Sequence, residues 1–81
     1  MRLFDPMKSK DQEERLLKIA EKIKKLRIDA GYTSYENFAV KHGLDRKQYW
    51  RMEKGQNFML STLLRIIDIH KVSLAEFFED L

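Results

Sequence analysis

Apolar side chains recur at helical spacing in the first long segment of the chain. Between Asp11 and Ala30 they return every three or four positions, which is the spacing of one face of an α-helix. Ser9 and Asp11 are both suited to cap the start of this helix, because each is followed three residues later by Gln or Glu. Gly31 is suited to end it. The predicted apolar face consists of Leu16, Ile19, Ala20, Ile23, Leu26 and Ala30.

A capping-box pattern opens a second, shorter predicted helix. In this pattern the Thr33 hydroxyl and the Glu36 carboxylate satisfy N–H groups that are free at a helix start. We expect the helix to turn Phe38 and Ala39 toward the core. It should end at Gly43, because glycine readily adopts the positive φ that often follows a helix.

The third predicted helix follows after a connection of only about three residues, 43–45. Asp45 is suited to cap its start, and Gln48 stands at the reciprocal position of the same pattern. The helix should run to Lys54 and end at Gly55. Two short helices joined by such a turn are the outline of a DNA-reading helix-turn-helix, an outline that many other α-helical domains share.

Two further helices are predicted in the remainder of the chain. The fourth is amphipathic, has Asn57 as a candidate cap and ends near His70. The fifth opens with a capping box formed by Ser73 and Glu76. No segment alternates as a strand does, so the predicted fold class is all-α with five helices. The apolar residues expected to turn inward here are Leu60, Leu63, Leu64, Ile67, Leu74, Phe77 and Phe78.

The length of 81 residues allows one small domain. We expect residues 1–10 to form a flexible leader and residues 11–81 to form the domain. A chain this short buries only about 60% of its unfolded surface and has little apolar interior for a substrate pocket. Without cysteine it has no disulfide, no thiolate zinc site and no sulfur nucleophile. We therefore expect neither an enzyme nor a cofactor.

The sequence also predicts neither a metal site nor a membrane protein. His42 and His70 have no cysteine and no second histidine three or four residues away, which is the usual ligand spacing. Uninterrupted apolar runs are short, and residues 1–10 lack the apolar stretch of a signal peptide. We expect no metal, no membrane contact and a cytoplasmic location.

The charges of the chain are unevenly distributed. Residues 1–54 carry fourteen basic and nine acidic side chains, whereas residues 55–81 carry two and four. On the third predicted helix, one side holds the apolar Tyr49 and Met52. Arg46 projects from its first turn, and the edges of the outer side are formed by Gln48 and Trp50. The cations clustered opposite the apolar side are Lys47, Arg51 and Lys54.

This basic face has the chemistry to bind nucleic acid. Arginine can donate two hydrogen bonds to guanine O6 and N7, lysine can donate to the same acceptors, and glutamine can pair with adenine. Lysine can equally hold a phosphate. A basic outer face can also be merely solvated, so for this helix alone both interpretations remain open.

The order of residues from Lys18 to Phe78, about three quarters of the chain, resembles a known family. It is similar to the XRE (Cro/cI-type, lambda-repressor-like) helix-turn-helix family of transcription regulators. The residues that carry the resemblance are Ile23, Leu26-Arg27 and Gly31, then Phe38-Ala39 with Gly43-Leu44, then Arg51 to Gly55, Leu60 to Ile66 and Val72 to Phe78.

The resemblance implies a five-helix lambda-repressor-like fold with its helix-turn-helix at about residues 35–54. It implies a sequence-specific regulator of transcription, a repressor, that reads the major groove of double-stranded DNA with helix 46–54. The base-reading positions carry over onto Arg46, Lys47 and Arg51. The residues that would hold the DNA backbone are Ser34, Tyr35, Gln48, Lys54, Gln56 and Asn57.

Four further residues carry over as structural ones. The small Ala39 lets the two helices of the motif approach, and Gly43 takes the positive φ of the turn. Arg27 is expected to pair with Glu53 and so to tie the first helix to the third. The chain departs from the family in having Tyr35 where a glutamine often bonds a phosphate, Tyr49 where a β-branched residue is usual, and Met59 where a small polar cap is usual.

One recognition helix reads only a few base pairs, so specific binding normally needs two copies about 34 Å apart along the DNA. We therefore expect a homodimer, and DNA binding can be what brings the two copies together. The alternative is a protein-interaction or antitoxin-like module on the same fold, binding through Tyr49, Trp50 and Phe58. We expect Trp50 to pack against the neighbouring helix. The alternatives are that it contacts a deoxyribose or a thymine methyl, or that it is a hot spot for a protein partner.

Overall fold

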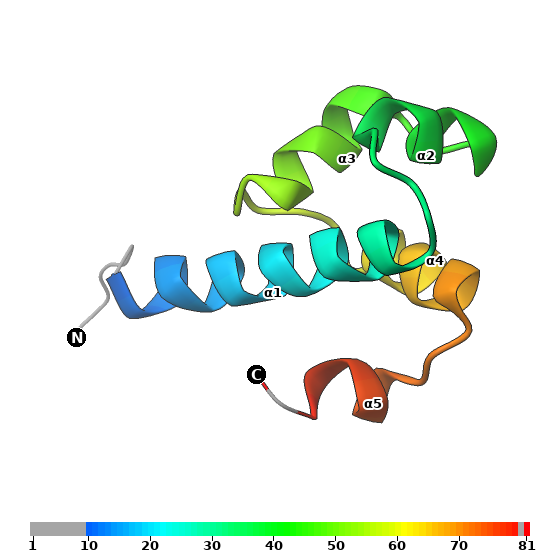
Figure 1. Cartoon of the computed structure of the whole chain (residues 1–81). Coiled ribbons are helices and arrows are strands. Elements are labelled where there is room, and N and C mark those ends of the chain that lie inside the picture. The colour runs from blue at the N-terminus through cyan, green and yellow to red at the C-terminus, as the bar shows by residue number, and fades with distance from the viewer. Residues whose placement is uncertain (1–9, 80) are drawn as a thin grey trace.

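A computed structural model of the chain describes residues 10–79 and 81. The predicted leader, residues 1–10, lies outside the described residues except for Lys10, which is the first residue of a helix. The described part contains five helices and no strand, which confirms the all-α class (Figure 1). The helices are α1 (Lys10–Asp29), α2 (Tyr35–Lys41), α3 (Arg46–Glu53), α4 (Leu60–His70) and α5 (Leu74–Phe78).

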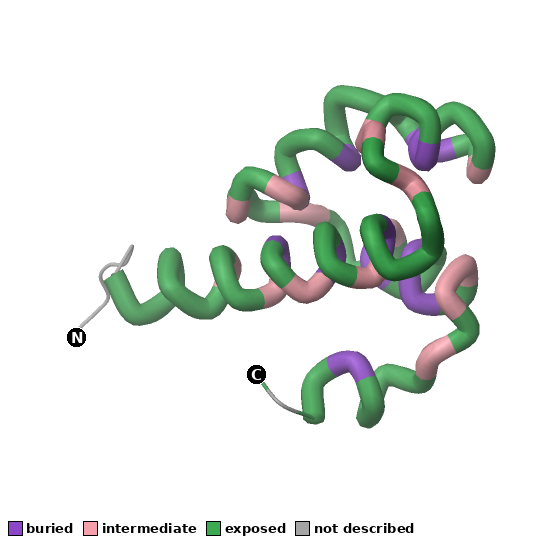
Figure 2. Tube along the Cα trace, in the orientation of Figure 1, coloured by how far each residue is buried: buried purple, intermediate pink, exposed green. Residues whose placement is uncertain are grey.

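The long helix α1 packs mainly against α3, whereas α2 packs on α3 and α5 on α4. In Figure 1 the pair α2 and α3 lies on one side of α1, α4 passes beside it, and α5 lies on the side away from α2 and α3. Figure 2 shows that the first turns of α1 are exposed and that its buried positions lie farther along. These buried residues are Ala20, Ile23 and Arg27.

Two of the predicted helix caps are present and one is shifted. The Asp45 carboxylate accepts a hydrogen bond from the Gln48 N–H at 2.9 Å and starts α3. Ser73 opens α5 with a complete capping box. At α2 the cap is Ser34, one residue later than the predicted Thr33, because the Ser34 hydroxyl oxygen accepts the Asn37 N–H at 3.2 Å. Ser34 and Thr33 carry equivalent hydroxyls, and only the backbone path selects between them.

The prediction that Asn57 caps α4 is wrong. The N-cap residue of α4 is Met59, which makes no side-chain cap hydrogen bond. The Asn57 side-chain oxygen instead accepts the N–H of Phe58, its own neighbour, at 2.9 Å. Asn57 lies two residues before the N-cap, so it serves the connection between α3 and α4 and leaves the start of α4 without a side-chain cap.

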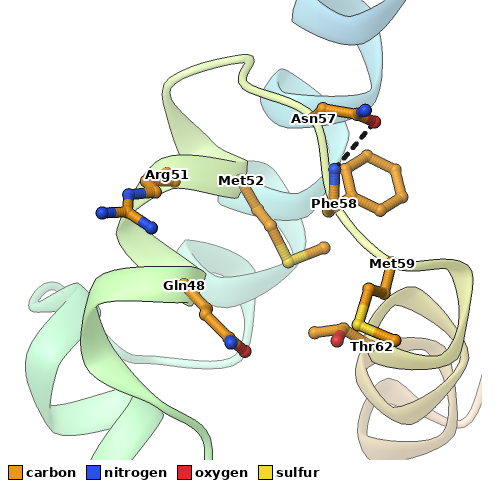
Figure 3. A pocket seen from close by; sticks show the side chains of 7 residues that line it. All are labelled: Gln48, Arg51, Met52, Asn57, Phe58, Met59 and Thr62. Carbon is orange, nitrogen blue, oxygen red and sulfur yellow. Dashed lines mark hydrogen bonds between the residues drawn. The ribbon is translucent and has the colours of Figure 1, made fainter.

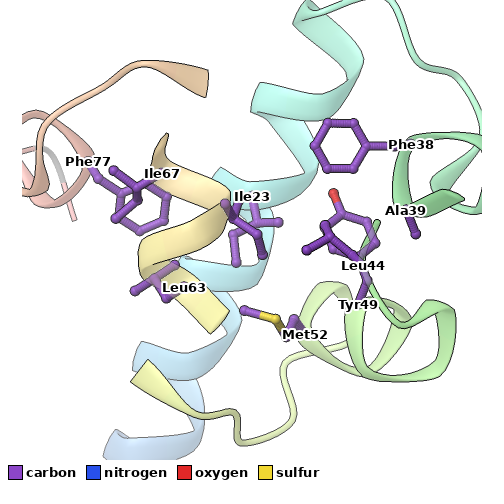
Figure 4. Packing of buried hydrophobic residues seen from close by; sticks show 10 residues of the cluster. Ile23, Phe38, Ala39, Leu44, Tyr49, Met52, Leu63, Ile67 and Phe77 are labelled. Carbon is purple, nitrogen blue, oxygen red and sulfur yellow. The ribbon is translucent and has the colours of Figure 1, made fainter. Parts of the chain in front are cut away.

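All five helices contribute to one hydrophobic core (Figure 4). Phe38 of α2 and Phe77 of α5 are completely buried, and Figure 4 shows them at opposite ends of the cluster. The prediction that α5 closes the core with three residues is wrong for two of them, since Leu74 is 47% and Phe78 40% exposed. A helix of five residues has little more than one turn, so only one of its side chains points inward. The remaining members of the core are Ile23, Ala39, Leu44, Tyr49, Met52, Leu63, Ile66 and Ile67.

The fourth predicted helix also buries fewer residues than its pattern suggests. Leu63 and Ile67 are buried, but Leu60 is 61% and Leu64 38% exposed. The packed face of α4 is completed by Ile66 instead. Among the described residues, none of the helices combines the length and the apolar character that crossing a lipid bilayer requires.

Candidate nucleic-acid interface

Helix α3 is held in place through its inner side. Tyr49 is 1% and Met52 2% exposed, and both belong to the core. Burial raises the pKa of the Tyr49 hydroxyl far above its ordinary value, so this side chain stays neutral. Glu53 completes the inner side, where its carboxylate accepts a hydrogen bond from Arg27 Nε of α1 at 2.7 Å.

Four exposed cations, which we call the α3 strip, follow α3: Arg46 in its first turn, Lys47 and Arg51 opposite Tyr49 and Met52, and Lys54 at its C-cap. All four side chains are exposed. Neither acid of this segment lies among them, because the Asp45 carboxylate accepts the Gln48 N–H at the helix start and Glu53 is paired with Arg27. An eight-residue helix is about 12 Å long, so the strip spans roughly the width of a DNA major groove.

One hollow, the α3–α4 hollow, borders the strip on the side of α4 (Figure 3). Its volume is about 330 Å³. In Figure 3 the Gln48 side chain extends into the space between α3 and α4, whereas the Arg51 guanidinium points away from the other lining side chains. The lining of the α3–α4 hollow thus combines amide and hydroxyl groups with apolar side chains. The lining residues are Gln48, Arg51, Met52, Asn57, Phe58, Met59 and Thr62.

A second hollow, the α2–α3 hollow, borders the strip on the opposite side. Its volume is about 280 Å³, and it lies where the start of α2 meets the outer side of α3. Two cations of the strip and two aromatic side chains surround it, together with one acid. The lining residues are Tyr35, Glu36, Arg46, Lys47 and Trp50.

Three of the predicted backbone-binding residues line the two hollows, and the other three lie beside them or at the end of α3. Tyr35 lines the α2–α3 hollow and is half-buried against the core. Ser34 lies beside it as the cap of α2. Gln48 and Asn57 both line the α3–α4 hollow. Gln56 lies in the connection that follows α3, fully outside the core.

Sequence reasoning missed two members of the flanks. Thr62 lines the α3–α4 hollow with its hydroxyl, and Glu36 places an acid beside Arg46 and Lys47 in the α2–α3 hollow. Thr62 lies in the first turn of α4 and Glu36 in the first turn of α2. The sequence marks Glu36 only as a capping residue and gives no sign of either residue beside α3, because this position depends on how the helices pack.

Trp50 does not simply pack against the neighbouring helix as predicted. Its side chain is 40% exposed and lines the α2–α3 hollow. The Lys54 ammonium lies over the indole, with Nζ 5.6 Å from the ring centroid. The indole therefore belongs to the outer surface of α3, beside the strip, and only part of it is covered.

The predicted structural residues Ala39 and Gly43 lie in α2 and in the connection between α2 and α3. Ala39 is completely buried in the core between the helices. Gly43 has φ +70°, in the left-handed region that favours glycine, and the next N–H, of Leu44, donates to the Ala39 carbonyl at 2.8 Å. This connection turns the chain from α2 into α3 and sets the face that α3 presents outward.

Both histidine rings contact one core residue, Phe38. The His42 ring is 4.7 Å from the Phe38 ring, and the His70 ring is stacked on Phe38 at 5.2 Å with an interplanar angle of 5°. Burial, with a smaller contribution from His42, lowers the pKa of His70. The described residues contain no group of three or more His, Cys, Asp or Glu side chains arranged to hold a metal ion.

Comparisons of the chain with models of protein families, with curated proteins and with solved structures find no match.

Proposed function

We propose that this protein binds double-stranded DNA in a sequence-specific manner and regulates transcription as a lambda-repressor-like (XRE-type) repressor. In this proposal α2 and α3 form a helix-turn-helix, and α3 lies in the major groove. The observation that carries the proposal is the α3 strip, in which four exposed cations follow a helix whose opposite side is buried.

Three residues of the strip would read base edges. Arg46, Lys47 and Arg51 are exposed on α3 and have the donors that match the guanine acceptors O6 and N7. Arginine can do so with two parallel hydrogen bonds, which adds geometric specificity. Removing one good contact of this kind typically costs about 1–3 kcal/mol of discrimination.

The two flanks would hold the sugar-phosphate backbones that border the groove. On the α2 side, Ser34 and Tyr35 are placed for this contact. On the α4 side the groups are Gln48 and Asn57, and Thr62 joins them, while the exposed Gln56 lies in the connection after α3. Lys54, at the end of α3, would bind a phosphate by charge. Such contacts position the helix without reading sequence.

The bound form would contain two copies of the chain. One α3 reads only a few base pairs, so a pair of copies about 34 Å apart would give the selectivity that a regulator needs. We therefore propose a homodimer on a palindromic site.

Selection of bound sequences from a pool of random duplexes tests the proposal. We expect a palindromic consensus whose half-sites are one turn of DNA apart. On the selected duplex, the double variant Lys47→Ala/Arg51→Ala should bind at least about tenfold more weakly. The matched control is Lys18→Ala/Lys24→Ala, which removes two exposed cations of α1 and should change affinity less than about threefold. A pool that enriches no sequence, or equal losses in the two variants, would refute the proposal.

One of the three residues expected to bind a partner in the alternative, a protein-interaction module, is buried. Tyr49 is 1% exposed, so no partner can contact it in this fold. Trp50 and Phe58 remain, but they line different hollows on opposite flanks of the strip. The salt dependence separates the two functions: about six phosphate contacts give a slope near −5 in log K against log salt, whereas an interface centred on aromatics depends little on salt.

A further inference from the structure

Trp50 gives the α3 strip an apolar element at its edge. One helical turn separates it from Arg46 and Lys47 on one side and from Lys54 on the other. The Lys54 ammonium lies 5.6 Å from the centre of the indole ring. Tyr35 of α2 lies across the same hollow and belongs in part to the core. The indole thus has three cations within one helical turn, while 40% of its surface is exposed.

This placement limits what the exposed indole can contact in a DNA complex. If α3 lies in the major groove, the faces of the bases are stacked out of reach. The only large apolar group that the bases present there is the C5-methyl of thymine. The cations around Trp50 would meanwhile be drawn to phosphates and base acceptors on the same stretch of DNA, which brings the indole close to the groove.

The same surroundings disfavour a protein partner for Trp50. Aromatic hot spots at protein interfaces are typically fully desolvated. Here three cations lie within one turn of the indole, and only one acid, Glu36, lines the same hollow. Covering Trp50 with another protein would therefore desolvate several charges of one sign, which is costly unless the partner supplies acids in the same places.

We propose that Trp50 is a specificity-determining residue whose indole contacts the C5-methyl group of a thymine at the edge of each half-site. This inference rests on the proposed DNA-binding function and adds a base preference to it. Arg46 and Lys47 would then read the neighbouring base pairs by hydrogen bonds, while Trp50 selects thymine by an apolar contact.

Replacing thymine by uracil tests this directly, because the exchange removes only the methyl group. The probe is the duplex selected from the random pool, remade with deoxyuridine in place of each thymidine in turn. At one position in each half-site, wild-type affinity should fall about fourfold, the effect of losing one buried methyl-sized group. Trp50→Ala should bind the thymine duplex more weakly by a similar factor or more and should be insensitive to the exchange.

A control variant and a crosslinking measurement show whether the effect belongs to Trp50. Leu64→Ala shortens a side chain of similar exposure, 38%, on α4 outside both hollows, and it should keep the wild-type response to uracil. A photoreactive 5-iodouracil at the sensitive position should crosslink to Trp50, identified by peptide mapping. If no thymine position responds, or if Trp50→Ala retains the response, the inference is wrong while the DNA-binding proposal stands. If the pool enriches no sequence, both fall together.

Discussion

Arg27 of α1 and Glu53 of α3 form a buried ion pair with two hydrogen bonds. Arg27 Nε donates to Oε2 at 2.7 Å and Nη2 donates to Oε1 at 3.1 Å. The side chains of Arg27 and Glu53 are only 5% and 7% exposed. Arg27 Nη1 also donates to the backbone carbonyl of Tyr32 at 2.8 Å. One guanidinium therefore ties together the end of α1, the connection to α2 and the last turn of α3.

Removing one member of this pair should destabilise the fold strongly. Glu53→Ala leaves the Arg27 guanidinium buried without its counter-charge, which typically costs about 3–5 kcal/mol in the free energy of unfolding. Urea unfolding followed by circular dichroism measures the loss. The control is Asp29→Ala, which breaks the exposed Lys25–Asp29 pair and should cost less than about 0.5 kcal/mol. Equal losses in the two variants would show that the buried pair does not hold α3 on α1.

Gly43 follows α2 and Gly55 follows α3, and both have positive φ, so they allow the effect of a clash to be compared with the effect of backbone strain alone. The φ values are +86° for Gly55 and +70° for Gly43, so replacement by alanine should cost about 1 kcal/mol at either position. At Gly55 a Cβ would also lie 2.6 Å from Leu17 Cδ2, whereas nothing lies within 4 Å at Gly43. We therefore expect Gly55→Ala to lower the free energy of unfolding more than Gly43→Ala.

A third variant isolates the cause of that difference. In a Leu17→Ala background the methyl group at position 55 has nothing to displace, so the two glycine substitutions should cost the same. Chemical denaturation of the wild type, of Leu17→Ala and of each glycine substitution in both backgrounds gives the comparison. A difference that persists without the Leu17 side chain would contradict the steric explanation.

The stability of the protein should fall in mild acid because of His70. Burial lowers the pKa of His70 in the folded state, while an unfolded histidine titrates at about 6.5. As the pH drops below about 6.5, the unfolded chain binds a proton that the folded chain does not, so the free energy of unfolding decreases until the folded pKa is passed. Above about pH 6.5 this contribution to stability is fully present.

Two histidine variants check this assignment. His70→Leu should show a smaller loss of stability between about pH 7.5 and about pH 5 than the wild type, measured as the shift in the urea midpoint. His42→Gln removes the neighbouring group that adds to the shift, so its loss should be intermediate. If all three proteins lose the same stability, the acid sensitivity arises from other groups.

The uncapped start of α4 predicts a stabilising substitution. Met59 is the N-cap residue, is 69% exposed and makes no side-chain cap hydrogen bond. Met59→Ser supplies an acceptor for the free N–H groups with little loss of burial, so it should raise the free energy of unfolding by about 0.5–1 kcal/mol. Ser73→Ala is the reciprocal control, since it removes an existing capping box and should cost about 1 kcal/mol. No gain from Met59→Ser would mean that solvent already satisfies this helix start.

Local patterns were sufficient to predict the helices. The caps at Asp45 and Ser73 act over three residues, and the positive φ of Gly43 belongs to a single residue. Such interactions are encoded within one turn, so the sequence shows them directly. The shift from Thr33 to Ser34 marks the limit of this approach, because adjacent hydroxyls offer the same chemistry.

Exposure was harder to predict than helix position. Leu74, Phe78 and Leu60 all fit an apolar pattern, yet each is substantially exposed. An apolar residue is buried only where another element covers it, and the covering elements here are short helices whose angles to α1 the pattern does not contain. Trp50 was misjudged for the same reason, since the α2–α3 hollow leaves two-fifths of it uncovered.

The sequence by itself determined the five helices, most of their ends and the basic composition of α3, because periodicity, caps and charge act within a few residues. The tertiary structure alone decided which groups stand beside that basic face. Glu36 and Thr62 flank α3, and the His70 ring stacks on Phe38, only through the way the helices pack. These arrangements depend on contacts between residues far apart in the chain, which local patterns do not encode.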